Sequence, residues 1–241
     1  MKNLIKIVGF LFVGCLGLGF IVSKFEKKKG CVESHKPYGI YEKHIKRPLD
    51  FGLSLFALII LSPLLLIIAV AVRIKLGSPV VFRQERSGLG GKIFTIKKFR
   101  TMTNEKDSEG NLLPDEDRLT RFGKFLRSTS CDKLLELENI IKAEMSIVGN
   151  RPLLVEYLDR YSEEQKHRHD VRPGLTSLSA SKKRNLASWD EKFEDDVKYV
   201  NRITFFGDVK IILDTVKIVL RKEGINSETS ATMEAFTGDE K

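Results

Sequence analysis

The sequence predicts an α-rich α/β protein with an N-terminal apolar helix, a re-entrant membrane helix and a compact cytoplasmic domain of one small sheet and amphipathic helices. Two apolar stretches, at residues 4–22 and 51–72, predict the first two parts. Short β-prone runs and amphipathic stretches further along predict the third. Lys and Arg total 41 against 32 Asp and Glu, a formal net charge of +9. This balance favours an anionic lipid surface or phosphorylated substrates.

Nucleic acid is not an expected partner, since the sequence has neither zinc-finger spacing nor an RNA-binding aromatic motif. The three cysteines are too few and too scattered for a disulfide framework or a zinc site, which fits a reducing compartment.

Residues 1–30 are expected to form an apolar anchor. No small-x-small cleavage site follows the apolar stretch, so we favour a retained helix over a removed signal peptide. The basic residues at 24–29 favour a cytoplasmic position for its C-terminal end. Residues 31–46 are predicted to be a linker.

The second apolar stretch, within residues 49–72, is predicted to enter the membrane and return. Ser62-Pro63 interrupts it at its middle, where proline removes a backbone hydrogen bond and bends a helix. Serine can satisfy the freed carbonyl group. Basic residues flank both ends, so both ends prefer the cytoplasmic side. The alternative is a kinked helix that spans the bilayer.

The remaining chain has the pattern of a mixed polar domain. The runs 80–82 and 93–96 flank a glycine-rich turn and predict a hairpin. Residues 103–118 are expected to be a charged mobile loop. The expected helices, from their apolar periodicity, are 130–142, 188–201 and 206–220. The tail, 222–241, is expected to be disordered.

Between Arg73 and Met102 there are eight Lys and Arg residues and one acid, Glu85. Such a cluster after a membrane segment can bind lipid headgroups or a pyrophosphate, or it can be a solvated basic face. The order of several short motifs is more specific than charge: KRPLD (46–50), FRQERSGLGGKIFTIKKFRTM (82–102), TRFGKFLRSTS (120–130), MSIVGNRPLL (145–154), RHDVRPGLT (168–176) and the stretch from Trp189 to Asp208.

In this order the motifs resemble those of the bacterial sugar transferases, the membrane-embedded polyprenyl-phosphate phosphoglycosyl transferases. The resemblance implies a sugar transferase domain at 47–221 on the cytoplasmic side of the cell inner membrane, in contact with phospholipids. It implies transfer of a sugar 1-phosphate from a nucleoside diphosphate sugar, expected to be a UDP-sugar, to polyprenyl phosphate. Mg²⁺ would be the cofactor and glycan or exopolysaccharide assembly the process.

The resemblance places the nucleophile at Asp132, where the family has an Asp-Glu pair at the start of a helix. Here the glutamate is replaced by Lys133. Glu136 is four residues from Asp132 and would share a helix face with it, so Asp132 and Glu136 are the candidate metal ligands. Alternatively, Lys133 itself neutralises phosphate charge.

Other polar residues match the family's spacing and form the expected phosphate-binding set: Lys98, Arg100, Arg127, Arg151, Arg184, Asp196 and Asp208. Taken singly, each of them is explained by solvation or a structural ion pair. His167 and His169 are expected at the solvated surface, because no third metal ligand is near them in sequence. Asp115 and Glu116 are expected to be solvated charges.

Two departures from the family pattern leave a second hypothesis open. Asn150 replaces a proline, and residues 177–183 lack the family's glycines and aromatic residue. Together with Lys133, these changes are compatible with a non-catalytic paralog that binds membrane lipid, a nucleotide sugar or an active partner.

Overall fold

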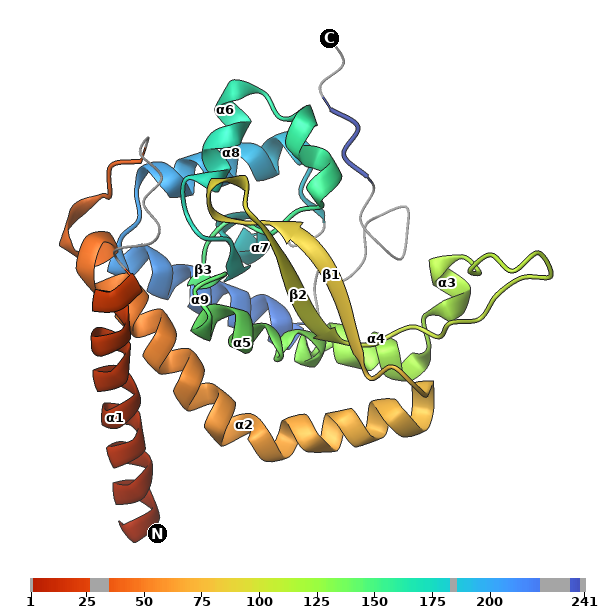
Figure 1. The fold of residues 1–241 in the computed structure, drawn as a ribbon, viewed down its shortest axis with the longest axis horizontal. Helices are drawn as coiled ribbons and strands as arrows, with labels where there is room; N and C mark the ends of the chain where they lie inside the picture. Colours follow the sequence, from red (N-terminus) through yellow and green to blue (C-terminus); the bar gives the residue numbers. More distant parts are fainter. Residues whose placement is uncertain (1, 27–34, 183–185, 222–234, 239–241) are drawn as a thin grey trace.

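The structure is a computed structural model that describes residues 2–26, 35–182, 186–221 and 235–238. It is mostly helical and has two small two-stranded sheets, in agreement with an α-rich α/β protein (Figure 1). In chain order the elements are α1 (Lys2–Glu26), η1 (Tyr41–Ile45), α2 (Lys46–Leu76), β1 (Val81–Ser87), η2 (Leu89–Gly91), β2 (Ile93–Phe99), α3 (Asp115–Arg118), α4 (Arg121–Ser128), η3 (Cys131–Lys133), α5 (Glu136–Ile141), β3 (Ser146–Val148), η4 (Val155–Arg160), α6 (Glu163–Lys166), η5 (His167–His169), β4 (Gly174–Thr176), α7 (Leu178–Lys182), α8 (Trp189–Asn201) and α9 (Phe205–Arg221).

Helix α2 is continuous but bends near its middle, as the sequence predicts (Figure 1). Pro63 has no N–H to donate to the carbonyl of Ile59. The Ser62 hydroxyl donates to that carbonyl instead, with 2.8 Å between Oγ and O. The serine therefore compensates for the hydrogen bond that the proline removes.

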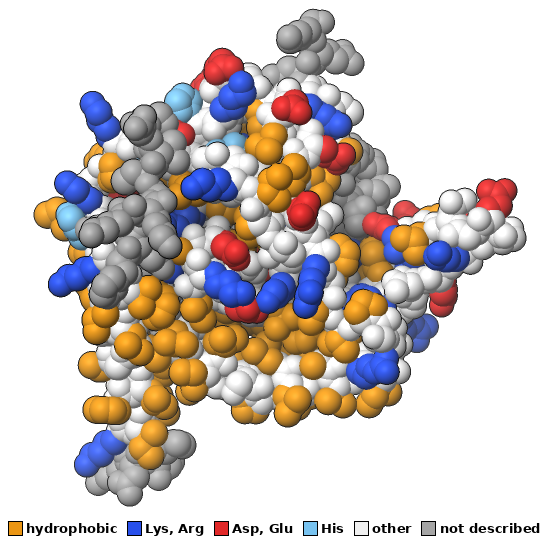
Figure 2. Space-filling view, in the orientation of Figure 1, with side chains coloured by type: hydrophobic (Ala, Val, Ile, Leu, Met, Phe, Trp, Pro, Cys, Tyr) orange, Lys and Arg blue, Asp and Glu red, His pale blue; other side chains and the backbone are white. Residues whose placement is uncertain are grey.

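Helices α1 and α2 are both long and apolar enough to cross a membrane. Only 11% of the apolar window of each is buried, so α2 is not the core helix of a globular protein. Figure 2 shows their apolar side chains as a band along one side of the molecule, with basic side chains gathered at its edge. The large apolar residues that α2 exposes are Ile59, Ile60, Leu64, Leu66, Ile67, Val70 and Ile74.

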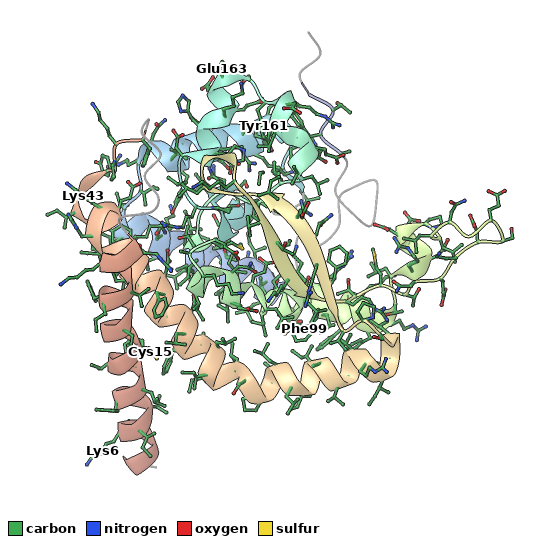
Figure 3. All side chains as sticks on the ribbon, in the orientation of Figure 1. Lys6, Cys15, Lys43, Phe99, Tyr161 and Glu163 are labelled. Carbon is green, nitrogen blue, oxygen red and sulfur yellow. The ribbon has the colours of Figure 1, made fainter. Side chains whose placement is uncertain are left out.

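The first half of α2 packs closely against α1. A Cβ on Gly19 would lie 2.3 Å from the backbone oxygen of Pro48, and a Cβ on Gly52 would lie 2.8 Å from the Cα of Leu16. Cys15 is buried beside this crossing (Figure 3). Glycine is needed at both positions because the two backbones leave no room for a side chain.

The predicted hairpin is confirmed: β1 and β2 pair antiparallel, with Val81 opposite Phe99 and Ser87 opposite Ile93. Phe94 and Ile96 of β2 pack on α5, and this cluster rests on the middle of α2. Phe99 packs against Ile68 on the second half of α2 (Figure 3). The hairpin and α5 thus lie directly on the apolar helix.

The start of α2 is fixed to the polar domain by hydrogen bonds. The Asp50 carboxylate accepts from the hydroxyl of Ser146, at 2.5 Å, and from the N–H of Ile147 on β3. Arg47 donates to the carbonyls of Ile140 and Ile141 at the end of α5. These contacts hold the membrane helix and the polar domain in one orientation.

Several sequence-based expectations need correction. Residues 41–46, expected within a linker, are helical and lead directly into α2. The expected helix at 130–142 is divided into η3 and α5, which Leu134 and Leu135 separate, and Ser130 lies outside both because it precedes η3 in a left-handed conformation with φ of 57°. Within 103–118, Asp115 begins the short helix α3 and pairs with Arg118 at 2.5 Å. The expected helices at 188–201 and 206–220 are confirmed as α8 and α9.

Part of the tail that was expected to be disordered is placed in the structure. Phe236 is only 4% exposed and packs against Tyr157, Phe193 and Trp189. Its backbone N–H donates to the Tyr157 hydroxyl at 3.1 Å. The expectation is therefore wrong for residues 235–238, while 222–234 and 239–241 lie outside the described residues.

Candidate active site

Asp132 lies in η3, the short turn between α4 and α5, and is only 6% exposed. The left-handed backbone of Ser130 ends α4 and turns the chain into η3. Nζ of Lys133 is 3.3 Å from one Asp132 carboxylate oxygen and 3.4 Å from the other. The predicted nucleophile is therefore a buried carboxylate covered by the lysine that follows it.

Glu136, at the first position of α5, is the second carboxylate of this site and is 3% exposed. Its Oε1 lies 3.5 Å from Nζ of Lys98 on β2. That oxygen has no hydrogen-bond partner among the described residues. Burial raises the pKa of Glu136, whereas the nearby ammonium groups of Lys98 and Lys133 oppose this shift.

Lys98 is only partly exposed, with 24% of its side chain accessible, and it is paired with Glu136. Burial lowers its pKa to about 8; Glu136 opposes the shift, and the positive charges of Lys133 and Arg151 add to it. Since β2 rests on α5, the hairpin register decides that Lys98 lies beside Glu136.

Two arginines add positive charge on the same side. Burial and, to a smaller extent, repulsion from Arg151 together lower the pKa of Arg86 to about 10. The buried Nε of Arg86 has no hydrogen-bond partner among the described residues. Mutual repulsion between arginines is costly unless an anion is shared between them, so this pair fits a phosphate group.

Arg127, at the end of α4, belongs to the same site. Its Nε donates to the hydroxyl of Thr101 at 3.1 Å. Burial lowers the pKa of Arg127, while the nearby carboxylate of Asp132 has the opposite effect. Of the predicted phosphate-binding set, the structure thus places Arg127 near Asp132, Lys98 beside Glu136, and Arg151 near Lys98.

Three other members of that set, Arg100, Asp196 and Asp208, have structural partners. Arg100 is buried and donates to the carbonyl of Ser78 at 2.8 Å, after the end of α2. Asp196 is buried and accepts two hydrogen bonds from Arg168, at 2.7 and 3.0 Å. Arg184 lies outside the described residues.

Asp208 lies at the start of α9 and joins three parts of the fold. Its carboxylate accepts hydrogen bonds from Tyr41 at 2.8 Å, from Lys46 at 2.6 Å and from Tyr199 at 2.9 Å. These partners come from η1, the start of α2 and α8. The arrangement indicates that Asp208 fixes the membrane helix to the polar domain.

Sequence reasoning missed the role of Arg86 and misplaced His169. Arg86 lies in the motif at 82–102, but its charge alone did not distinguish it from its basic neighbours. His169 is 8% exposed, not solvated, and its Nδ1 lies 3.1 Å from the carbonyl of Gly88. His167 is paired with Asp170 at 2.9 Å and is exposed, as expected.

The residues at this site do not fit a divalent cation held by Asp132 and Glu136. Each carboxylate already faces an ammonium group, and the described residues contain no group of three His, Cys, Asp or Glu able to hold a metal. Unit charges 4 Å apart interact by about 4 kcal/mol at an effective dielectric constant of 20, so a dication beside these lysines meets strong repulsion. Among the described residues, Arg127 and Lys133 lie near Asp132, Arg86, Lys98 and Lys133 lie near Glu136, and Arg151 lies near Arg86 and Lys98.

Comparison with known proteins agrees with this arrangement of motifs. The sequence profile of the family described as bacterial sugar transferase matches residues 41–222, more than half of the chain. The chain belongs to the bacterial sugar transferase family. The resemblance inferred from the motifs is thereby confirmed.

Three relatives illustrate the family. This sugar transferase is 50% identical over 194 residues to a Bacillus subtilis (strain 168) protein named uncharacterized sugar transferase EpsL, which covers 80% of this chain and 96% of that protein. It is 36% identical over 187 residues to a Caulobacter vibrioides UDP-glucose:undecaprenyl-phosphate glucose-1-phosphate transferase, covering 73% and 69%. It is 33% identical over 202 residues to a Salmonella typhimurium undecaprenyl-phosphate galactose phosphotransferase, covering 76% and 42%. The chain spans less than half the length of several curated relatives.

The geometry of this sugar transferase suits an anionic substrate. Positive side chains from β1, β2, α4 and η3 lie near the two buried carboxylates, and β2 and α5 rest on α2. A phosphorylated group bound there would meet both a nucleophile and charges that stabilise it. The same position would be next to any membrane that α2 enters.

Proposed function

We propose that this chain transfers a sugar 1-phosphate from a nucleoside diphosphate sugar to polyprenyl phosphate and so initiates glycan or exopolysaccharide assembly. The names of its relatives include undecaprenyl phosphate and UDP-glucose, which supports a UDP-sugar donor and a polyprenyl phosphate acceptor. The observation that carries the proposal is the buried carboxylate of Asp132 among convergent cations.

In the first step, an oxygen of Asp132 attacks the β-phosphorus of the donor. A bond forms between this oxygen and phosphorus, and the bond from phosphorus to the oxygen that bridges the α-phosphate breaks. The nucleoside monophosphate leaves with that electron pair, and a phosphosugar remains on Asp132. An oxygen of polyprenyl phosphate then attacks the same phosphorus, and the carboxylate leaves.

The cationic residues have separate tasks in this scheme. Lys98, Arg86 and Arg151 bind the diphosphate, and Arg127 orients Asp132 through charge attraction. Helix α2 dips into the inner membrane and returns, so the domain at 47–221 remains on the cytoplasmic side and meets its lipid acceptor at the surface. The exposed apolar face of α2 and its bend support this position.

Asp132→Asn is the test of the proposal, because an amide is a far poorer nucleophile than a carboxylate. Purified protein in lipid nanodiscs would be incubated with UDP-glucose, UDP-galactose and their N-acetylamino analogues. We expect release of UMP and a phosphosugar adduct on Asp132 in the intact mass, both lost in Asp132→Asn and retained in Asp159→Asn, a change at an exposed carboxylate. An adduct that persists in Asp132→Asn would contradict the assignment.

A binding protein without catalysis is the second candidate, and the contact of Lys133 with Asp132 is the observation that favours it. An ammonium group that stays on the carboxylate would block attack on the donor. Saturable binding of a UDP-sugar without release of UMP, in the parent and in Lys133→Glu alike, would identify this second function.

A further inference from the structure

Lys133 differs from the other lysines of the site in its symmetrical contact with the nucleophile. Its Nζ is nearly equidistant from the two oxygens of Asp132, at 3.3 and 3.4 Å. Adjacent side chains on a regular helix point in different directions. The contact here depends on the short turn of η3 and on the long, flexible stem of lysine.

The side chain of Lys133 is 29% exposed, whereas that of Asp132 is 9% exposed. The ammonium group therefore covers the carboxylate from the accessible side, where an incoming phosphate would approach. An ammonium group has three donors and can contact a carboxylate and a phosphate oxygen together. A bound divalent cation would have to share this position with it.

The second carboxylate of the site also has an ammonium group close to it. Glu136 faces Lys98 at 3.5 Å and also lies within the field of Lys133. Both carboxylates are thus balanced by side chains of the protein, and the surrounding arginines make the site positive overall. Such a charge distribution recruits a diphosphate without a metal ion.

We propose that Lys133 replaces the divalent cation in this chain, so that its phosphosugar transfer is independent of Mg²⁺. This inference rests on the proposed function. When the donor binds, the ammonium group of Lys133 contacts a non-bridging oxygen of the β-phosphate and keeps its proton throughout. A carboxylate oxygen of Asp132 bonds to phosphorus as the bond to the bridging oxygen breaks, and the nucleoside monophosphate leaves with that electron pair as an anion, so the step needs no further reactant.

The experiment uses the full-length protein in nanodiscs with the same UDP-sugars, after treatment with EDTA. We expect adduct formation and release of UMP to continue in EDTA and to change little when Mg²⁺ is restored. Lys133→Met should lower the rate about a hundredfold or more, as expected for losing a charged group that stabilises the transition state. Lys142→Met, which removes a half-exposed lysine paired with Glu138, should leave the rate unchanged.

Lys133→Glu provides the converse test and a measurement that does not depend on activity. Binding of Mn²⁺, followed by electron paramagnetic resonance, should be absent in the parent and appear in Lys133→Glu, where a third carboxylate joins the site. Any activity of Lys133→Glu should then require Mg²⁺. Melting curves of each variant would show that the fold is retained.

Two results would overturn the inference. One is a parent protein that releases UMP only when Mg²⁺ is present, which would leave the proposed function intact. The other is binding of Mn²⁺ by the parent that is lost in Asp132→Asn. Absence of adduct and of UMP release in every condition would instead overturn the proposed function, and the inference with it.

Discussion

At the scale of single residues, the sequence shows which side chains are charged. It does not show which residue each charged side chain contacts. Lys98, Arg100 and Asp196 match family positions equally well, yet only Lys98 lies beside a carboxylate of the candidate active site. Arg100 and Asp196 satisfy buried groups elsewhere. The difference arises because a side chain's partner depends on the packing of elements far apart in the chain.

His169 illustrates how burial lowers the pKa of a histidine side chain. Its Nδ1 contacts a carbonyl, which can only accept, so Nδ1 carries the proton and the buried Nε2 does not. Protonation of Nε2 would bury a charge with no acceptor among the described residues. Burial accordingly lowers the pKa of His169 to about 4, with a further contribution from Arg168.

This shift predicts a pH dependence of stability. Between the ordinary pKa of 6.5 and the folded value of about 4, the unfolded chain binds more protons than the folded one. The free energy of unfolding should therefore fall as the pH decreases through this interval, by about 3 kcal/mol from this residue. Melting temperatures of the parent and of His169→Gln, measured from pH 7.5 to 4.5, would show a shallower dependence in the variant.

His167→Gln is the matched control, because His167 is exposed and paired only at the surface. Its melting temperature should follow the parent across the same pH range. If the melting temperatures of the parent and of His169→Gln depended equally on pH, the conclusion that burial lowers the pKa of His169 would be contradicted.

At the scale of elements, the best predictions concern segments whose shape depends on nearby residues. Helix α8 begins at a capping box in which Ser188 and Glu191 bond each other's backbone, and its apolar periodicity is regular. By contrast, the expected helix at 130–142 does not begin at Ser130, because Ser130 adopts a left-handed conformation, which its residue type does not require.

The bend in α2 leads to a prediction about topology. Pro63→Leu restores an N–H that can bond the Ile59 carbonyl, so the helix should straighten. In a background without other cysteines, Lys43→Cys and Lys75→Cys label the two flanks of α2, and both positions are exposed. With Pro63 present, a membrane-impermeant maleimide should label both only from the cytoplasmic face.

In Pro63→Leu we expect one of the two positions to be labelled from the opposite face. Leu64→Ile, a neighbouring apolar change that keeps the proline, should retain the parental pattern. Labelling of the two positions from opposite faces in the protein that has Pro63 would show that α2 spans the membrane.

At the scale of the whole molecule, the C-terminal segment connects with a distant part of the fold. Phe236 enters an aromatic cluster formed by η4, the following loop and α8, and Arg160 donates to its carbonyl. Trp189, the single tryptophan, has its ring centroid 5.4 Å from that of Phe236. The C-terminal segment therefore covers this aromatic cluster, which the amphipathic pattern of the helices alone would leave exposed.

Phe236→Ala should release this segment and expose Trp189. The emission maximum of tryptophan should move to longer wavelength, acrylamide quenching should increase, and the free energy of unfolding should fall by about 3 kcal/mol or less, the lower end for a buried phenylalanine. Phe206→Ala, at a residue that is 81% exposed, should change none of these signals. Unchanged emission in Phe236→Ala would mean that the segment does not cover Trp189.

Family membership, the hairpin, helices α8 and α9 and the break at Ser62-Pro63 followed from the sequence alone. They depend on local rules: apolar periodicity, turn residues, the missing N–H of proline and the spacing of short motifs. Tertiary structure alone decided that Lys98 lies beside Glu136, that His169 is buried and that Phe236 packs on Trp189. These contacts depend on how elements pack in three dimensions, and neither residue type nor spacing along the chain encodes that packing.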